Sequence, residues 1–138
     1  MSSHIETIRE WFSLVERKDN QAIGERFVGE GYTWIDHTNG VVATTQEQLE
    51  AAMVEDSQLS DRKYVIKEAF ETTDGAVIVL LSITDTLTGE WRGIKGTGQQ
   101  VHREMCDIFR FDTDGRVISE EAYEDALSIM RQLGAVSI

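Results

Sequence analysis

Apolar residues near the start of the chain recur with the three-and-four residue spacing of an amphipathic helix. They are Ile5, Ile8, Trp11, Phe12 and Val15. Ser2 and Ser3 precede them and are both candidate N-caps. We expect a second, shorter helix over residues 21–28, because the glycines Gly29 and Gly31 that follow favour a break in helical structure.

The next stretches predict a strand and a further helix. YTWIDH, residues 32–37, is rich in β-forming residues and predicts a strand. In TTQEQLEAAMVED, residues 44–56, Thr45 and Gln48 have the spacing of a capping box, which predicts the start of a third helix.

From residue 63 onward, the pattern is typical of strands separated by tight turns. Strands are expected at residues 63–72, 76–85, 99–111 and 116–123, with a closing helix over residues 125–134. The turn signals are Asp74-Gly75 and the segment Asp112–Gly115, and Gly134 is a candidate C-cap. Helices followed by an antiparallel meander predict an α+β fold with segregated layers. If the sheet curls around the N-terminal helices, its concave face forms a pocket for a small molecule.

Composition narrows the class of protein. A length of 138 residues predicts one domain over residues 1–138. A net charge of −12 disfavours nucleic acid and anionic membrane surfaces as partners. Cys106 is the single cysteine, so no intramolecular disulfide is possible. The longest apolar run, AVIVLL, is too short to span a bilayer, and no signal-peptide pattern is visible, so we expect a cytoplasmic protein.

Strand alternation assigns candidate side chains to faces. Trp34 and Asp36 share one face of their strand. In the strand over residues 99–111, Asp107 lies opposite Arg110, and the arginine is better accommodated in water, so we expect Asp107 to point inward. A buried carboxylate costs several kcal/mol unless it is paired, hydrogen-bonded or neutral, so an inward Asp107 needs a reason.

For the last strand, periodicity leaves open which of two residue sets faces the pocket. One set is Ile118, Glu120 and Ala122, and the other is Ser119, Glu121 and Tyr123.

Four motifs occur in order along nearly the whole chain: WFSLVERKDNQAI, TWIDH, DIFRFDTDGRVISEEAYED and RQLG. With these motifs the chain resembles the ketosteroid isomerase and SnoaL-like polyketide cyclase group of the nuclear transport factor 2-like superfamily. The resemblance implies a cone-shaped, curved antiparallel sheet wrapped around N-terminal helices. It also implies a homodimer formed through the outer face of the sheet.

The resemblance assigns roles to individual residues. Asp36 corresponds to the general base of the isomerases, and Asp107 to their protonated acid, which donates a hydrogen bond to the developing enolate. Trp11 stands in place of the isomerase tyrosine that also donates there. In the cyclase pattern, Ala122 replaces an acid–base aspartate and Asp107 replaces a histidine. By the same register, Glu120 and Ala122 face the pocket, which makes Glu120 a third candidate carboxylate.

Each candidate also has a structural explanation. Asp36 could close a turn, Asp107 could bond to a backbone amide, and Glu120 could belong to a solvated acidic run. His37 is a candidate for the pocket rim, with a surface histidine as the alternative.

The large aromatic residues are open to two explanations as well. They could line a cavity for a ring-shaped ligand or simply pack in the core. They are Trp11, Trp34, Trp91 and Phe109.

These observations predict a cofactor-independent acid–base enzyme of the isomerase or cyclase type. Its substrate would be a small hydrophobic cyclic carbonyl compound that reacts through an enolate. No metal-ligand spacing and no glycine-rich phosphate loop is present in the sequence, so we expect neither a metal nor a nucleotide. The alternatives are a non-catalytic binding or interaction domain on the same fold, and a dehydratase or hydrolase using the same pocket.

Overall fold

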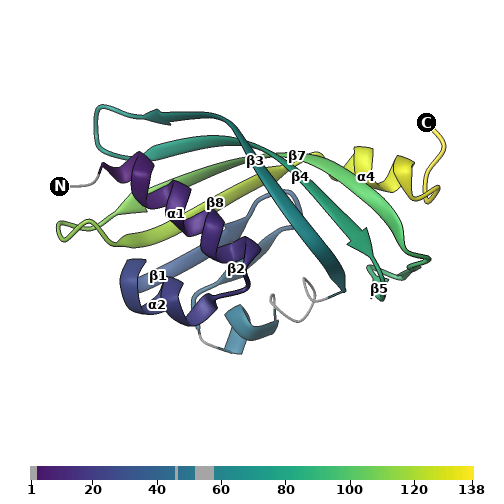
Figure 1. Cartoon of the computed structure of the whole chain (residues 1–138), viewed down its shortest axis with the longest axis horizontal. Helices are drawn as coiled ribbons and strands as arrows, with labels where there is room; N and C mark the ends of the chain where they lie inside the picture. Colours follow the sequence, from purple (N-terminus) through teal and green to yellow (C-terminus); the bar gives the residue numbers. More distant parts are fainter. Residues whose placement is uncertain (1–2, 46, 52–57) are drawn as a thin grey trace.

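The computed structural model describes residues 3–45, 47–51 and 58–138 (Figure 1). The helices are α1 (His4–Glu16), α2 (Asn20–Phe27) and α4 (Ala126–Gln132), and residues 47–51 are also helical. The strands are β1 (Val28–Asp36), β2 (Val41–Ala43), β3 (Leu59–Glu71), β4 (Val77–Leu87), β5 (Glu90–Trp91), β6 (Ile94–Lys95), β7 (Gln99–Phe111) and β8 (Val117–Glu124). The α+β class expected from the sequence is confirmed.

Six strands form one sheet in the order β2-β1-β8-β7-β4-β3. All neighbouring pairs are antiparallel except β1 and β8, which are parallel. The sheet is therefore mixed, not wholly antiparallel as expected, because the chain leaves β1, builds the meander of β3, β4, β7 and β8, and returns beside its first strand. Side-chain alternation has the same period in both directions, so the sequence pattern could not reveal this parallel pair.

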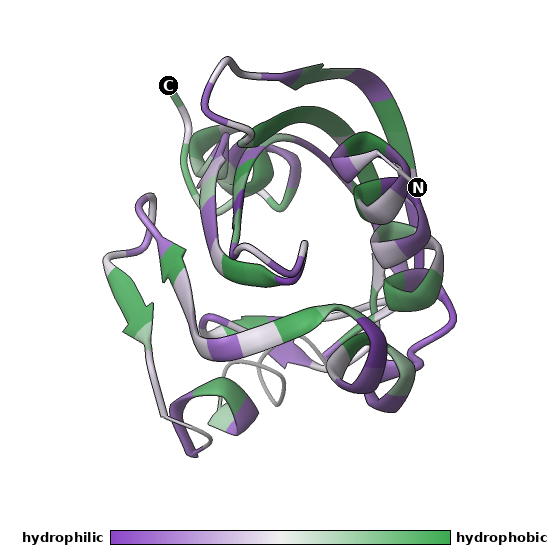
Figure 2. Ribbon diagram, turned by 90° about the vertical axis from the view of Figure 1, so that its left-hand side faces the viewer, coloured by the Kyte–Doolittle hydropathy of each residue, from purple (hydrophilic) through white to green (hydrophobic). Residues whose placement is uncertain are grey.

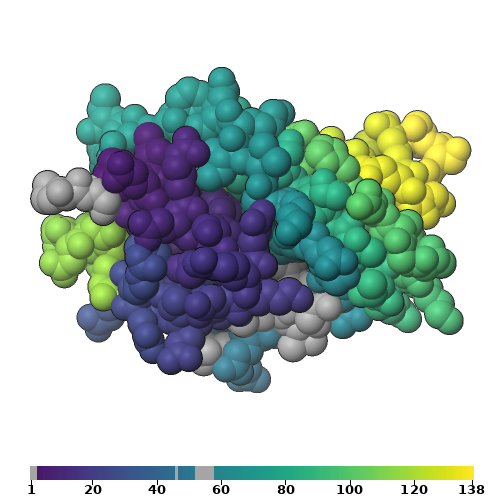
Figure 3. All heavy atoms as spheres, in the orientation of Figure 1, coloured from purple at the N-terminus to yellow at the C-terminus, as the bar shows by residue number. Residues whose placement is uncertain are grey.

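The sheet is strongly curved, and α1 and α2 lie on its concave side (Figures 1 and 2). The side chains of these two helices cover the left-hand and central part of the face of the molecule seen in Figure 3. Helix α1 begins with a complete capping box, in which Ser3 accepts from the Glu6 backbone and Glu6 accepts from the Ser3 backbone. Of the two candidate caps, Ser3 is the one used.

Two buried clusters occupy the concave side. The first joins α1 to the sheet and includes Ile8, Trp11, Phe12, Leu14, Val77, Val79, Leu81, Ile83 and Phe109. The second lies against α4 and contains Leu59, Leu87, Trp91, Val101 and Ile129. Burying this many apolar side chains is the main stabilising contribution to the fold.

Several boundaries differ from the sequence expectation. Strand β1 already begins at Val28, and β2 and the small β5–β6 hairpin were not predicted. Arg92 and Gly93 form the hairpin turn with positive φ angles of 51° and 78°, a two-residue turn for which the sequence gives only the glycine as a signal. The capping box of Thr45 and Gln48 is present, while the remainder of the helix expected up to residue 56 lies mostly outside the described residues. None of the helices in the described ranges is long and apolar enough to cross a membrane.

Candidate active site

A cavity of about 610 Å³ lies between the helices α1 and α2 and the concave face of the sheet. Residues from α1, α2, β1, β3, β7 and β8 line it, together with residues of the β5–β6 hairpin. Small-molecule sites usually have volumes of about 300–1,000 Å³, so the cavity has the size of a ligand pocket.

Ala122 on β8 lies between the two predicted aspartates. In the strand register it is paired with Asp36 of β1 on one side and with Asp107 of β7 on the other. Neighbouring strands are about 4.8 Å apart, which separates the Cα atoms of the two aspartates by roughly 10 Å. All three residues line the pocket, and the methyl side chain of Ala122 leaves the space between the carboxyl groups open. The structure thus brings both aspartates to one cavity.

Asp107 is almost completely enclosed, with 1% of its surface exposed. Burial raises the pKa of its carboxyl group well above the usual value, and the charge and hydrogen bonding of Glu120 raise it further. Arg103 acts in the opposite direction and lowers the pKa. The Oδ1 atom of Asp107 is buried and has no hydrogen-bond partner. The environment therefore favours the protonated, neutral acid and leaves one of its oxygens unused.

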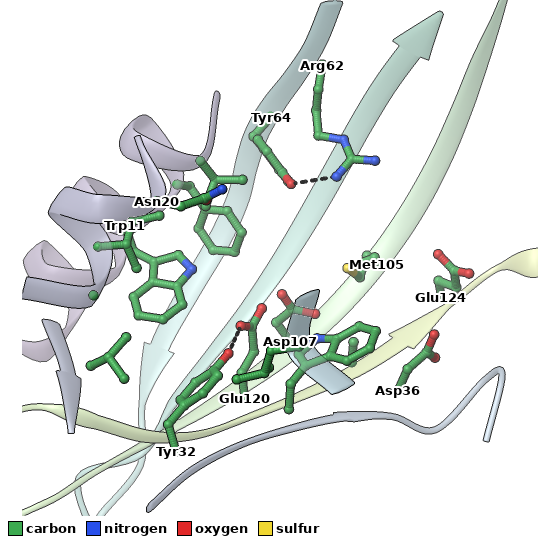
Figure 4. A pocket seen from close by; sticks show the side chains of 18 of the residues that line it. Trp11, Asn20, Tyr32, Asp36, Arg62, Tyr64, Met105, Asp107, Glu120 and Glu124 are labelled. Atoms are coloured by element: carbon green, nitrogen blue, oxygen red, sulfur yellow. Dashed lines mark hydrogen bonds between the residues drawn. The ribbon is translucent and has the colours of Figure 1, made fainter. Parts of the chain in front are cut away.

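Glu120 and Tyr32 complete an acidic group with Asp107. The Tyr32 hydroxyl donates a hydrogen bond of 2.8 Å to Oε2 of Glu120, as Figure 4 shows. Burial raises the pKa of Tyr32 well above its usual value, and Glu120 and Asp107 raise it further, so the tyrosine remains a donor. Tyr32 is not among the site residues predicted from the sequence. The signal was available, since Tyr32 has the same strand parity as Trp34 and Asp36.

Asp36 lines the pocket and also closes the turn after β1. Its Oδ1 accepts from the backbone of Asn39 at 3.1 Å, and its Oδ2 accepts from the Asn39 side-chain amide at 2.6 Å. The structural explanation considered for Asp36 is therefore correct, and it coexists with a position on the cavity wall.

The other end of the pocket is rich in arginine. Asp85, of which 1% is exposed, accepts from Nε of Arg62 at 2.7 Å and pairs with Nη2 of Arg103 at 3.5 Å. Nη1 of Arg103 donates to Glu124 at 2.7 Å, and Arg92 pairs with the same carboxylate at 3.4 Å. Opposite charges are in direct contact here, which compensates for the cost of burying them.

This arginine network connects with the rest of the cavity. The Asn39 amide donates to Glu124 at 3.0 Å, and Arg62 donates to the hydroxyl of Tyr64 at 3.3 Å (Figure 4). This network was not predicted from the sequence. Alternation could have found Arg103, because it lies four positions before Asp107 and thus on the same face of β7.

Of the four aromatic residues predicted to contact a ligand, three line the cavity and one does not. Trp11, Trp34 and Trp91 are on the pocket wall. Phe109 is fully buried outside it, where its ring packs edge-on against Trp11 at a centroid distance of 5.6 Å. The prediction of Phe109 as a substrate contact is wrong, because α1 covers this end of β7 and turns the position into core.

His37 also lies outside the pocket. It follows Asp36 and points to the opposite side of the sheet, where Nε2 bonds to Glu121 at 2.9 Å and the ring stacks on Tyr123. Its placement at the pocket rim is therefore wrong, and the surface alternative is correct. Cys106 is likewise on the outer face and half-buried, and burial raises the pKa of its thiol.

The remaining predicted residues, Glu120 and Ala122, face the cavity as the family register implied. Within the described part of the chain, no group of three or more His, Cys, Asp or Glu side chains is arranged to hold a metal ion.

Comparisons with known proteins agree with this architecture. The family model of the SnoaL-like polyketide cyclases matches residues 7–133. This match spans most of the chain, so the chain belongs to the SnoaL-like polyketide cyclase family. A comparison with curated protein sequences found no significant match.

Solved structures show the same fold. AclR from Streptomyces galilaeus, a proposed hydroxylase, has a TM-score of 0.82 at 20% identity, with 97% of each chain covered. IdmH from Streptomyces antibioticus, a proposed polyketide cyclase, has a TM-score of 0.81 at 17% identity, covering 96% of this chain and 99% of IdmH. A protein of ketosteroid isomerase-like fold from Catenulispora acidiphila, solved with trimethylamine, has a TM-score of 0.62 at 18% identity, covering 78% and 77%. At these identities the likeness concerns the fold.

Proposed function

We propose that the chain is an enzyme of the isomerase or cyclase type that acts on a small hydrophobic cyclic carbonyl compound through an enolate. The observation that carries the proposal is the buried Asp107, whose raised pKa and unpartnered Oδ1 belong to a pocket that also holds Asp36. A neutral acid can donate a hydrogen bond to an oxygen that gains negative charge during the reaction.

The proposed chemistry uses two side chains in complementary states. The Asp36 carboxylate removes a proton from the carbon next to the carbonyl group, and the C–H electron pair forms the enolate. Asp107 stabilises the enolate oxygen by a hydrogen bond. In an isomerase, Asp36 then returns the proton to another carbon. In a cyclase, the enolate carbon attacks a second carbonyl carbon of the same molecule, and the new alkoxide takes up the proton.

Glu120, Tyr32 and Trp11 support this arrangement. Glu120 sits against Asp107 and accepts from Tyr32, so the two acids share an environment that favours one proton between them. Trp11 lines the same end of the pocket, where its indole N–H is a further donor. A family relative such as IdmH, described as a proposed polyketide cyclase, is consistent with this class of reaction.

The test is proton exchange, which needs no knowledge of the natural substrate. In D₂O, the wild-type protein should accelerate deuterium incorporation next to the carbonyl group of 2-tetralone, as followed by NMR. Asp36→Asn should slow this exchange by about 10²–10⁴-fold, because the base is lost. Asp107→Ala should slow it by about 10²–10³-fold, because the oxyanion donor is lost.

Asp114→Asn is the matched control, since this exposed turn aspartate is remote from the cavity and its substitution should leave exchange unchanged. Full exchange activity in Asp36→Asn would rule out Asp36 as the base. If Glu120→Gln alone then abolished exchange, the base would be Glu120.

The second candidate is a binding protein without turnover. The favouring observation is that both oxygens of Asp36 accept hydrogen bonds from Asn39, so the carboxylate already has a structural role in the turn. Tight binding of 2-naphthol, a phenol that mimics an enol, together with no proton exchange for any ketone tested, would support this candidate. A dehydratase or a hydrolase, the other alternative, would use the same pocket for a different reaction.

The homodimer also remains a proposal, as do the single domain and a cytoplasmic location. Val65 and Tyr123, which are 59% and 48% exposed, lie on the outer face of the sheet that the family resemblance implies as the interface. Light scattering should give twice the mass of one chain, and Val65→Asp combined with Tyr123→Asp should reduce it to a single chain.

A further inference from the structure

Two polar atoms on the inner face of β7 lack a partner. Among the described residues, the buried side-chain nitrogen and oxygen atoms without any hydrogen bond are Nε of Arg103 and Oδ1 of Asp107. Both residues line the cavity, and their exposed fractions are 6% and 1%. Buried polar groups are nearly always hydrogen-bonded, so two unpaired polar atoms in one pocket suggest that both bind the same missing partner.

The two residues lie one after the other along the inner face of β7. They are four positions apart on one strand, which places their Cα atoms roughly 13 Å from each other on the same face. Met105 lies between them on that face and lines the pocket with an apolar, adaptable side chain. Both side chains line the same cavity, so one bound molecule can approach both.

Arg103 cannot turn its free N–H to another protein partner. Its Nη1 donates to Glu124 at 2.7 Å and its Nη2 pairs with Asp85 at 3.5 Å, which fixes the plane of the guanidinium group. An arginine nitrogen is a donor only, so the missing partner must be an acceptor. An oxygen atom of a bound molecule fits this requirement.

We infer that the pocket binds its ligand lengthwise along β7, with one acceptor oxygen on Nε of Arg103 and a second oxygen on Asp107. The centre of the ligand is apolar and lies over Met105. The ligand is therefore a ring compound that carries oxygen at both ends, such as a diketone or a hydroxyketone. This inference rests on the proposed function for the reacting oxygen at Asp107, and it adds Arg103 as the residue that selects the second oxygen.

Two probes of matched shape test the inference by isothermal titration calorimetry. Both 6-methoxy-2-naphthol and 6-ethyl-2-naphthol offer a hydroxyl group to Asp107, but only the methoxy compound has an acceptor at the far end. The wild-type protein should bind the methoxy compound roughly tenfold more tightly, as expected for one hydrogen bond to a charged donor.

Arg103→Lys keeps the positive charge beside Asp85 and Glu124 but removes the Nε–H donor. This variant should bind the two probes within about threefold of each other, while Arg110→Lys should keep the wild-type preference. Arg110 is the matched control, because it lies on the outer, exposed face of the same strand.

Equal affinities of the wild-type protein for the two probes would overturn the inference, and so would a full preference in a folded Arg103→Lys variant. The comparison of the two probes on the wild-type protein tests the inference even if Arg103→Lys does not fold. Failure of the proposed function would look different. The methoxy preference would persist without proton exchange in 2-tetralone, whereas failure of the present inference alone would leave that exchange intact.

Discussion

Both ends of the pocket contain buried carboxyl groups, but the groups that surround them differ. At one end, Asp85 and Glu124 each contact arginine residues, so each of these two carboxylates has a guanidinium nitrogen within 4 Å. At the other end, Asp107 lies against Glu120, a second carboxyl group, which accepts a hydrogen bond from Tyr32.

The difference separates structural from chemical roles. Paired opposite charges hold neighbouring strands in place and fix the orientation of each group. Adjacent acids in an apolar setting disfavour ionisation, which makes one of them a proton donor at neutral pH. We therefore expect substitutions of the carboxylates at the arginine end to act mainly on stability, and substitutions at the acidic end to act mainly on protonation and activity.

The largest effect on stability is expected for Asp85→Asn. The substitution leaves Arg62 and Arg103 buried without their shared counter-charge, which should lower the free energy of unfolding by about 3–5 kcal/mol. Urea denaturation measures the change. Glu10→Gln, which breaks the exposed pair with Arg26, is the control and should cost less than about 1 kcal/mol. Equal losses in the two variants would contradict the role assigned to Asp85.

The second prediction concerns the pH dependence of stability. The folded-state pKa of Asp107 is raised, so the folded protein holds this proton more tightly than the unfolded chain does. The stabilisation is fully present below about pH 4 and is lost as pH rises through the folded-state pKa, by up to about 1.4 kcal/mol per pH unit. Asp107→Asn cannot lose a proton, so its free energy of unfolding should fall less with pH than that of the wild type.

Urea denaturation of the wild type and Asp107→Asn between pH 4 and pH 9 gives the comparison, with Asp114→Asn as a control that should parallel the wild type. Since Asp107 and Glu120 interact, the difference reports the titration of the pair. Parallel curves for all three proteins would show that Asp107 titrates normally.

A smaller effect is expected for Tyr32→Phe. It removes the donor to Glu120 inside the pocket and should lower the free energy of unfolding by about 1–2 kcal/mol. Tyr123→Phe makes the same change at an exposed tyrosine on the outer face, where the loss should be below about 0.5 kcal/mol. A Tyr32→Phe protein as stable as the wild type would remove Tyr32 from the acidic group.

The smallest effect is expected for His37→Ala. Because His37 lies on the outer face and bonds to Glu121, its loss should change the affinity for 2-naphthol by less than about twofold. Asp107→Ala provides the comparison and should weaken binding of the same phenol by roughly tenfold or more. Calorimetric titration of both variants decides, and a large effect of His37→Ala would return this residue to the site.

Periodicity predicted most of the elements. It placed β7 at residues 99–111, and it turned Asp107 inward because Arg110 occupies the opposite face. It could not separate pocket from core on one face, since Phe109 and Asp107 have the same parity and only the position of α1 distinguishes them.

Local sequence therefore determined the helices, the long strands, the family and the inward face of Asp107, because hydrophobic period, capping and turn residues act over a few neighbours. Only the tertiary structure decided that β1 lies parallel to β8, that Ala122 separates Asp36 from Asp107, and that Arg103 faces the same cavity. These relations join residues far apart in the chain. They depend on sheet order and curvature, which alternation along a single strand does not encode.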